Sequence, residues 1–421
     1  MFSIKFARFK LFIFYFILWF IVSISFASAQ TIFTLSTAID SGKANNASLK
    51  AEYLNVGISQ ADVITSRIRP NPVLNNQTLQ LTNQNLFAEK TNWYSAKNEQ
   101  IWWQLTKHIQ WPAQRKFKIQ FADETLTAAN NRYNDAVRNL CFTIGTSFIN
   151  CWYLKNKLNL LSSTKTKIDS FLQSNKFNNK INATDTARIK ILSDEYNLQY
   201  SVSFQQYNNE LANLKLLTGN ADSIAINTDD NIETIIPPGN LNTLLKKASE
   251  SRSDVELART TINATATNVK LQKSLVWPQP ELGFIYNPQN TIPYFGFFGT
   301  IEIPIFNRNQ GEIKKSNFLK QQAEEELAAT QLQAATDVST AYSTYEIEKK
   351  NLQKYEGILK QSKQIFDDIE MKYLKGNTTI LDFLDAQKNW FDTKQFYFDA
   401  LKSYHESYLQ LLFVTGLIAE L

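Results

Sequence analysis

The sequence has little of what a metal site, a disulfide scaffold or a catalytic centre requires. Its 421 residues include two histidines, two cysteines and two methionines. A relay for copper or silver ions would need soft sulfur ligands, which are almost missing here. His108 and His405 lie far apart in the sequence, and we assign His405 to packing or to the surface. We therefore predict that the protein is not an enzyme and that it holds no cofactor and no metal of its own.

The two cysteines are too far apart to bridge within the helix that is predicted around them. Cys141 and Cys151 are separated by ten residues, which is about 15 Å along a helix axis. Bridged cysteines have Cα atoms only about 4.4–6.8 Å apart. Cys151 also falls on an apolar position of the helical pattern described next, so we assign it to the core. Without a disulfide, the protein must be held together by packing or by assembly.

Glycine and proline are scarce, and they cluster outside the long periodic segments. From Gln114 to about Ser174 there is no proline and a single glycine, and apolar residues recur every seven positions. Sustained heptads predict helices wound around each other as coiled coils. About 60 residues at ~1.5 Å each would form a rod of roughly 90 Å. The heptad positions are Leu126, Tyr133, Leu140, Leu154, Leu161 and Ile168, then Val137, Ile144, Cys151, Leu158 and Leu172, and in the second half Val338, Tyr345, Leu352, Leu359, Phe366 and Tyr373.

A long hydrophobic run occurs only at the N-terminus. Basic residues precede a mostly apolar segment from Leu11 to Ile24, and the small residues Ala27-Ser28-Ala29 follow it. This order predicts that residues 1–29 are a signal peptide, with an uncleaved membrane anchor as the alternative. Its removal would lower the formal net charge from +5 to about +2. The basic composition therefore does not indicate a nucleic-acid partner, and we expect none.

The landmarks of the chain occur twice in the same order. A Pro-x-Pro motif follows a helical pattern at Pro70 and again at Pro278, and a Thr-Gly pair ends the last helix of each copy at Gly219 and Gly416. The copies are offset by roughly two hundred residues, far beyond the 20–50 residues of solenoid repeats. We therefore predict one duplicated body rather than independent domains. The first structural repeat comprises residues 30–235 and the second comprises residues 236–421.

Each copy also has an alternating, aromatic-rich stretch between its helices. Two strands of about 10 residues fit each stretch, and this length crosses a bilayer when the strand is tilted. Four strands would leave two unpaired edges, which lipid does not tolerate. We therefore predict an oligomer of eight strands from two protomers or twelve from three; a soluble sheet against a helix layer is the alternative. The apolar faces contain Ile101, Trp103, Leu105, Ile109 and Trp111 in the first copy, and Leu282, Phe284, Tyr286, Phe295, Phe297, Ile301 and Ile303 in the second.

The long helices reverse at matching places, one in each copy. The sequence Phe177-Asn178-Asn179-Lys180-Ile181 interrupts the first copy, and Tyr373 to Ile380 interrupts the second. In the second copy, Gly376 or Asn377 suits the left-handed conformation that ends a helix. The next helix can begin at a threonine cap, Thr378 or Thr379. Each copy is therefore predicted to contain a long helical hairpin.

An acidic residue follows each reversal. Asp382 lies in the first turn of the second-copy helix, where the helix dipole favours an anion. Asp185 is its counterpart in the first copy, because both positions are offset by the same number of residues as the two terminal Thr-Gly pairs. Asn179 stands where the second copy has Gly376, so the two tips differ.

These features together resemble the TolC family of outer-membrane efflux proteins. The resemblance covers essentially the whole chain after the signal. Its short C-terminus is more similar to the heavy-metal branch, which is CzcC/CusC-like. The motifs that carry it are the two Pro-x-Pro motifs, Ile303-Pro304-Ile305-Phe306 with Asn309-Gln310-Gly311, Tyr373-x-x-Gly376 with Asp382-x-x-Asp385-Ala386-Gln387, and Thr415-Gly416.

The family resemblance implies an α+β membrane protein that forms a homotrimer. Four strands per protomer would contribute to a twelve-stranded β-barrel in the lipid of the cell outer membrane, and the coiled-coil helices would form a periplasmic α-barrel. It implies a passive gated conduit for substrate from an inner-membrane RND transporter and a periplasmic adaptor (membrane fusion) protein. The expected cargo is heavy-metal cations, with drug or protein (type I secretion) export as the alternative. A secreted structural coiled-coil protein without a channel is a further alternative.

The resemblance also assigns roles to the helical tips. The carboxylates there could form a ring in the oligomer that favours cations and resists closure by mutual repulsion. Alternatively, Asp382 is only a charge at a helix N-terminus. The gate candidates are Asp382, Asp385 and Asp185. The candidates for docking to the adaptor are Asn178, Asn179, Lys180, Gly376, Asn377, Thr378 and Thr379.

Overall fold

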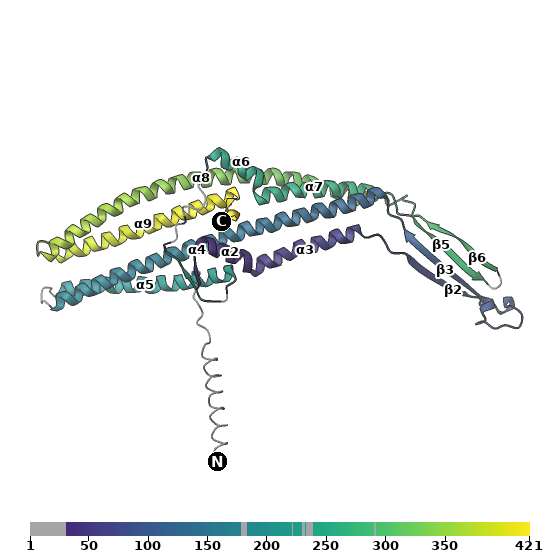
Figure 1. Cartoon of the computed structure of the whole chain (residues 1–421), viewed down its shortest axis with the longest axis horizontal. Helices are drawn as coiled ribbons and strands as arrows, with labels where there is room; N and C mark the ends of the chain where they lie inside the picture. Colours follow the sequence, from purple (N-terminus) through teal and green to yellow (C-terminus); the bar gives the residue numbers. More distant parts are fainter. Residues whose placement is uncertain (1–30, 178–182, 221, 230–231, 233–238, 290–291) are drawn as a thin grey trace, which may run out of the picture.

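Two helices run along almost the whole helical body of the protein (Figure 1). They are α4 (Pro112–Phe177) and α8 (Gln310–Leu374), and each belongs to one of the two predicted repeats. The structure is a computed structural model that describes residues 31–177, 183–220, 222–229, 232, 239–289 and 292–421. The predicted signal peptide therefore lies outside the described residues.

Each long helix is accompanied by two shorter helices that follow one another along it. In the first copy these are α3 (Ala47–Arg67) near the sheet and α5 (Ala183–Thr218) at the other end. In the second copy they are α7 (Ser253–Ser274) and α9 (Ile380–Thr415). The predicted helical hairpins are thus α4 with α5 and α8 with α9. Among the helices in the described part of the chain, none combines the length and the apolar character that a membrane crossing requires.

The heptad pattern marks the buried faces of the long helices, as predicted. Ile144, Cys151 and Val338 are completely buried, and Leu158 and Tyr345 are nearly so. They belong to one core at the middle of the helical body, where α4 meets α9 and the two copies join. Apolar faces of both halves of the chain are thus buried in this one core.

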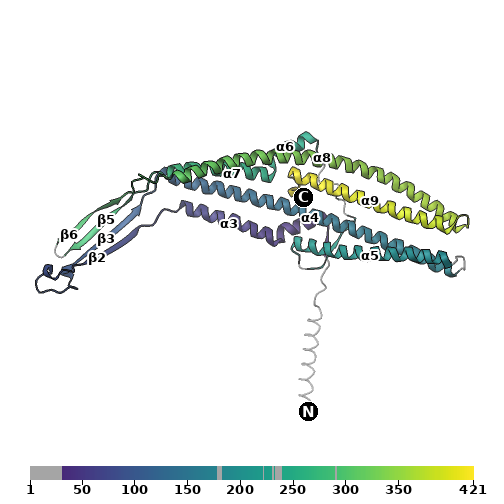
Figure 2. The same ribbon diagram turned by 180° about the vertical axis from the view of Figure 1, so that it is seen from behind.

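Two short helices and a small sheet surround this core, and the heptads did not predict them. Helix α2 (Leu35–Asn45) packs on α4, and α6 (Leu241–Ser251) packs on α8. Strand β1 (Thr31–Phe33) pairs in parallel with β4 (Ile224–Ile226). These elements widen the body around its middle (Figure 2). A 3₁₀ turn, η4 (Leu417–Glu420), follows α9 after Gly416 adopts the left-handed φ of 80°.

The cysteines and His405 are part of the core. Cys141 and Cys151 are both free and completely buried. Burial raises the pKa of the Cys141 thiol to about 11. His405 is 5% exposed and meets the Trp152 ring edge-on, with centroids 5.4 Å apart. Burial lowers the pKa of His405 to about 4, so it remains neutral.

Two buried arginines lie at the C-terminal end of α9. Arg252 donates to Asp254 over 2.9 Å and lies 3.1 Å from Asp337. Arg138 lies 2.8 Å from Asp135 and 3.4 Å from Asp254. Both arginines also donate to the last carbonyls of α9. The cations therefore satisfy acceptors at the negative end of the helix dipole and link four helices.

The four long strands form one antiparallel sheet at the end of the helical body. Its order is β2 (Val73–Gln80), β3 (Glu99–His108), β5 (Glu281–Gln289) and β6 (Ile292–Thr300). The two predicted strand pairs thus lie side by side, joined by β3 and β5, and β2 and β6 are the edges. The first pair is not a tight hairpin, because residues 81–98 form a longer loop between its strands. That loop contains the 3₁₀ turns η1 (Gln84–Leu86) and η2 (Ala96–Asn98).

The sheet has one strongly apolar face. Trp103 is opposite Tyr286, Leu105 is opposite Phe284, and Phe284 is opposite Phe297. All of these side chains are 43–84% exposed. The alternation was therefore predicted correctly within the strands, but β3 ends at His108 and β6 at Thr300, so Ile301 and Ile303 lie beyond β6. Ile109 and Trp111 lie beyond β3, because Pro112 starts α4 where a helix tolerates a missing N–H.

The helix–sheet junction joins the two copies through one buried polar side chain. Gln114 is 3% exposed and donates from Nε2 to the carbonyls of Ser274 and Trp277, over 2.9 and 2.6 Å. Its Oε1 accepts from Gln279 at 2.9 Å. The position of the sheet relative to α4 and α7 is thus held by hydrogen bonds as well as by packing.

Candidate functional site at the helical tips

The second-copy hairpin reverses at Gly376, as the sequence predicted. Gly376 has a φ of 76°, and its N–H donates to the Tyr373 carbonyl over 2.9 Å. The N–H of Asn377 donates to the Lys372 carbonyl, also over 2.9 Å. A left-handed glycine with these two bonds satisfies the free carbonyls at the end of α8.

Helix α9 then begins with a reciprocal cap between Thr379 and Asp382. The Asp382 N–H donates to Thr379 Oγ1 over 3.2 Å, and the Thr379 N–H donates to the Asp382 carboxylate over 3.1 Å. The hydroxyl groups of Thr378 and Thr379 also donate to that carboxylate, over 2.7 and 2.6 Å. These bonds lower the pKa of Asp382, and the bond from the Thr379 hydroxyl has the largest effect. Asp382 is therefore ionised and held in place by its own turn.

The other two gate candidates lie in different surroundings. Asp385 is exposed one turn after Asp382 and accepts from Asn389 Nδ2 over 3.1 Å. Asp185 lies in the first turn of α5 and is 3.7 Å from Arg188. Burial raises the pKa of Tyr373, and the negative charge of Asp185 raises it further. The charge of Asp185 in the first hairpin thus acts on Tyr373 in the second.

An aromatic cluster joins the two hairpins close to their tips. Phe171 of α4 stacks on Phe383 of α9, with ring centroids 4.7 Å apart. Both rings also lie against the Tyr373 ring of α8, with a centroid distance of 5.3 Å in each case. Sequence reasoning missed this cluster, because Phe171 lies next to the heptad position Leu172 and not on it.

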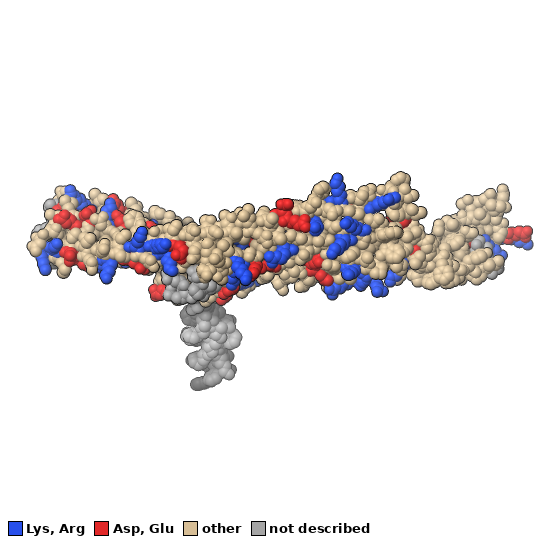
Figure 3. Space-filling view, turned by 90° about the horizontal axis from the view of Figure 1, so that it is seen from above, with Lys and Arg blue, Asp and Glu red and all other residues tan. Residues whose placement is uncertain are grey.

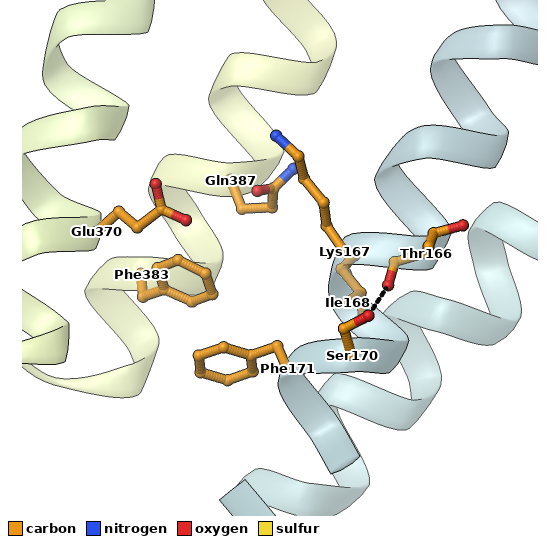
Figure 4. A pocket seen from close by; sticks show the side chains of 8 residues that line it. All are labelled: Thr166, Lys167, Ile168, Ser170, Phe171, Glu370, Phe383 and Gln387. Carbon is orange, nitrogen blue, oxygen red and sulfur yellow. Dashed lines mark hydrogen bonds between the residues drawn. The ribbon is translucent and has the colours of Figure 1, made fainter. Parts of the chain in front are cut away.

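A pocket of about 460 Å³ opens beside this cluster, between the two hairpins. Figure 4 shows Phe171 and Lys167 reaching from α4 toward Phe383, Gln387 and Glu370 of the second hairpin. Gln387 is 4% exposed. The two hairpins are therefore incompletely packed against each other at this pocket, although a buried cluster that includes Ile168 and Phe391 also joins them nearby.

The docking candidates divide into a described and an undescribed set. Gly376, Asn377, Thr378 and Thr379 all lie in the reversal between α8 and α9. The first-copy candidates lie outside the described residues; they are Asn178, Asn179 and Lys180. In the part of the chain that the structure describes, no group of three or more His, Cys, Asp or Glu residues is placed to hold a metal ion.

Several solved membrane proteins have the same architecture. CusC is 18% identical over 91% of this chain and 93% of its own, with a TM-score of 0.74. The outer membrane channel MtrE of Neisseria gonorrhoeae, in its open state, is 15% identical over 91% and 88%, with a TM-score of 0.73. The outer membrane protein VceC of Vibrio cholerae is 14% identical over 91% and 96%, with a TM-score of 0.70. No curated protein sequence matches the chain.

Helical hairpins on a four-stranded sheet are thus the fold that this chain shares with these solved proteins. The family described as Outer membrane efflux protein matches residues 244–417, which span most of the second repeat. The chain thus shares its fold with these solved proteins over most of its length, and the sequence of its second repeat is similar to the Outer membrane efflux protein family.

Proposed function

We propose that the protein is a passive, gated conduit through the outer membrane, with its helical body in the periplasm. The observation that carries the proposal is the four-stranded sheet, which has an exposed apolar face and two free edges in the described chain. Free edges are not stable in lipid. Three protomers would pair β6 of one with β2 of the next and close a twelve-stranded barrel.

The sides of the helical body support a ring of copies. Helices α3 and α5 lie on one long side with β2, and α8 lies on the opposite side with β6 (Figures 1 and 2). Both sides expose large apolar residues along the helices, which favours helix packing between neighbours. They are Leu54, Ile58 and Ile64 on α3, Ile191, Leu198 and Val202 on α5, and Leu332, Ile347, Ile358 and Ile365 on α8.

We assign gating to the tips, where the stack of Phe171 on Phe383 joins the two hairpins beside a pocket. The second hairpin is the moving part, because its reversal contains the left-handed Gly376. Opening would separate Phe171 from Phe383 and move Tyr373 away from Asp185. Asp382 and Asp385 would then be repeated around the opening as a ring of carboxylates.

Heavy-metal cations are the proposed cargo, with drug or protein export as the alternative. The carboxylates of Asp382 and Asp385 favour cations at the entrance, and the cargo would pass without a resident metal site. Selection would then belong to an inner-membrane RND pump. A strain without this protein should become sensitive to metal salts. Sensitivity to drugs alone would support the alternative cargo.

Docking of a periplasmic adaptor at the tips can be tested by crosslinking. Cysteines at Asn377 and Asn179 should crosslink to the adaptor in cells that pump. A cysteine at Arg132, on the exposed side of α4 far from both tips, is the control. Normal efflux without a crosslink at either tip would exclude this docking mode.

The conduit itself is tested by location and conductance. The full-length protein should fractionate with the outer membrane, migrate differently before and after heating, and conduct ions in planar bilayers. A soluble, elongated oligomer with no conductance would instead support the secreted structural coiled coil.

A further inference from the structure

Positive charge collects at the end of the helical body next to the sheet. Figure 3 shows Lys and Arg side chains gathered there, whereas both signs mix at the other end and the sheet is largely uncharged. The segments at this end contain eleven Lys and Arg against three Asp and Glu. The segments are residues 58–72, 107–121, 265–280 and 301–319.

Within this region, one hollow is lined by several cationic side chains. It has a volume of about 360 Å³ and lies where α3 and β3 end and α4 begins. Arg69, Lys107 and Arg115 line it together with His108. The Arg115 side chain is held there, because it donates to the Arg67 carbonyl over 2.9 Å. The volume is in the range of small-molecule sites, about 300–1,000 Å³.

The three cations of the hollow have no acidic partner within the described chain. None of Arg69, Lys107 and Arg115 forms an ion pair with a described Asp or Glu, whereas the neighbouring Arg67 lies 3.1 Å from Asp123. Like charges that line one hollow repel each other. An anion in the hollow would relieve this repulsion, and arginine in particular matches the geometry of a phosphate.

The cationic hollow lies at the end of the apolar face of the sheet. Lys107 follows Trp103 and Leu105 on that face of β3 and ends the apolar series. A second, mainly apolar hollow of about 500 Å³ adjoins it at Pro112 and is lined by Trp111 and Trp277. An apolar face that ends in tryptophan and cationic side chains is typical of a bilayer boundary.

We propose that the cationic hollow binds the phosphate of an anionic phospholipid headgroup in the leaflet that adjoins the helical body. The apolar hollow at Trp111 and Trp277 receives the neighbouring glycerol and the start of the acyl chains. The site rests on the proposed function, because it requires that the sheet spans the membrane. It would give the protein a preference for anionic over zwitterionic lipid at this boundary.

The test compares lipid binding by the purified full-length oligomer and by charge variants. Native mass spectrometry would count phosphatidylglycerol and phosphatidylcholine bound from an equal mixture. The wild type should retain phosphatidylglycerol preferentially, and Arg69→Gln, Lys107→Gln and Arg115→Gln together should remove the preference. Each cation near an anionic lipid surface contributes about 1 kcal/mol, so the preference should fall about fivefold per substitution.

A matched variant controls for net charge. Arg132→Gln, Lys354→Gln and Lys360→Gln also remove three exposed cations, but from the helices away from the sheet, and should leave the preference unchanged. The double variant Arg69→Lys with Arg115→Lys keeps the positive charge, and it should retain most of the preference for phosphatidylglycerol. Either an unchanged preference in the triple Gln variant or an equal loss in the matched variant would overturn the site.

Two further outcomes would also overturn it. If inorganic phosphate at the lipid concentration displaces phosphatidylglycerol, the hollow recognises free phosphate rather than lipid. If the triple Gln variant loses its oligomer while the matched variant keeps it, a neighbouring copy fills the hollow instead. If the wild-type protein conducts ions but shows no lipid preference, only the proposed lipid site is refuted. If the wild-type protein does not conduct, the proposed function itself is refuted.

Discussion

Phe171 and Phe383 stack with their ring centroids 4.7 Å apart and their planes at 19°. They are 212 positions apart in the sequence and come from different hairpins. This contact therefore joins the two hairpins close to their tips within one protomer.

Replacing Phe171 with alanine should loosen the tips without unfolding the body. A fully buried Phe→Ala costs about 3–5 kcal/mol, and the half-buried Phe171 should cost about 2 kcal/mol. Hydrogen exchange should accelerate in residues 366–383, and bilayer conductance should rise. The control is Phe396→Ala, because Phe396 is 54% exposed and should change stability by less than about 0.5 kcal/mol. Equal effects of the two variants would contradict a specific role for the stack.

A side chain at Gly376 should destabilise the reversal through its left-handed backbone alone. Gly376→Ala meets no atom within 4 Å, so its cost is that of a left-handed L-residue, about 1–2 kcal/mol. Gly357 lies inside α8, and its added Cβ would also meet no atom. Gly357→Ala should therefore stabilise the protein by about 0.5–1 kcal/mol. Thermal unfolding should shift in opposite directions for these two variants, and a shift of the same sign would refute the explanation.

Strand pairing between the copies should depend on Gly283. A Cβ at this position would collide with the backbone of Leu105 and Thr106 on β3. Gly283→Ala should therefore prevent the β3–β5 pairing that joins the two halves of the sheet, and the protein should lose its heat-modifiable form. In Gly296→Ala the added Cβ would lie 3.4 Å from its nearest neighbour, an atom of the Ile285 side chain. That variant should assemble normally, and a comparable defect in both would argue against backbone contact as the cause.

Arg252, which is buried at the end of α9, should contribute far more to the stability of the protein than a surface ion pair does. Removing one partner of a buried charge cluster costs about 3–5 kcal/mol, because the remaining charges stay buried. Arg252→Met should have an effect at the low end of this range, since it leaves Asp337 without its cation while Asp254 keeps Arg138 as a neighbour. Lys247 pairs with Glu420 over 3.0 Å at an exposed site, and Lys247→Met should cost less than about 1 kcal/mol. Chemical denaturation of the two variants under the same conditions measures the difference.

Acid should destabilise the helical body through His405. Burial lowers its pKa to about 4, whereas an unfolded histidine has a pKa of about 6.5. The unfolded chain therefore binds a proton between these values that the folded protein does not bind. Stability is complete above pH 6.5 and falls as the pH approaches 4, by about 2 kcal/mol at pH 5.

The variant His405→Phe isolates this contribution, because it keeps an aromatic ring against Trp152 without a titrating group. The loss of melting temperature between pH 7 and pH 5 should be smaller in His405→Phe than in the wild type. The same loss in both proteins would show that other groups control the acid response.

Local patterns in the chain predicted the regular elements well, because those patterns reflect local geometry. The seven-residue recurrence through Ile144 and Cys151 identified the buried face of α4, and alternation identified the apolar face at Trp103 and Leu105. The helix end was predicted at Gly376 or Asn377 and the next cap at Thr378 or Thr379, and the structure places them at Gly376 and Thr379. Each of these signals depends on φ/ψ preferences or on side-chain period, which neighbouring residues determine.

Contacts between distant segments could not be predicted in this way. The stack of Phe171 on Phe383, the arginines at the end of α9 and the Gln114 bonds to the Ser274–Trp277 turn all join segments more than one hundred residues apart. The roles of Asp382, Asp385 and Asp185 as a gate, and of the tips as a docking surface, stay predictions.

The sequence by itself therefore determined the duplication, the long amphipathic helices and the two strand pairs. Periodicity and glycine or proline placement specify which residues can share a face. Only the tertiary structure decided that the strand pairs join through β3 and β5, that α4 and α9 meet in one core, and that Arg69, Lys107 and Arg115 line one hollow. These relationships depend on how elements pack across the whole chain, and no local pattern records the spatial neighbour of a side chain.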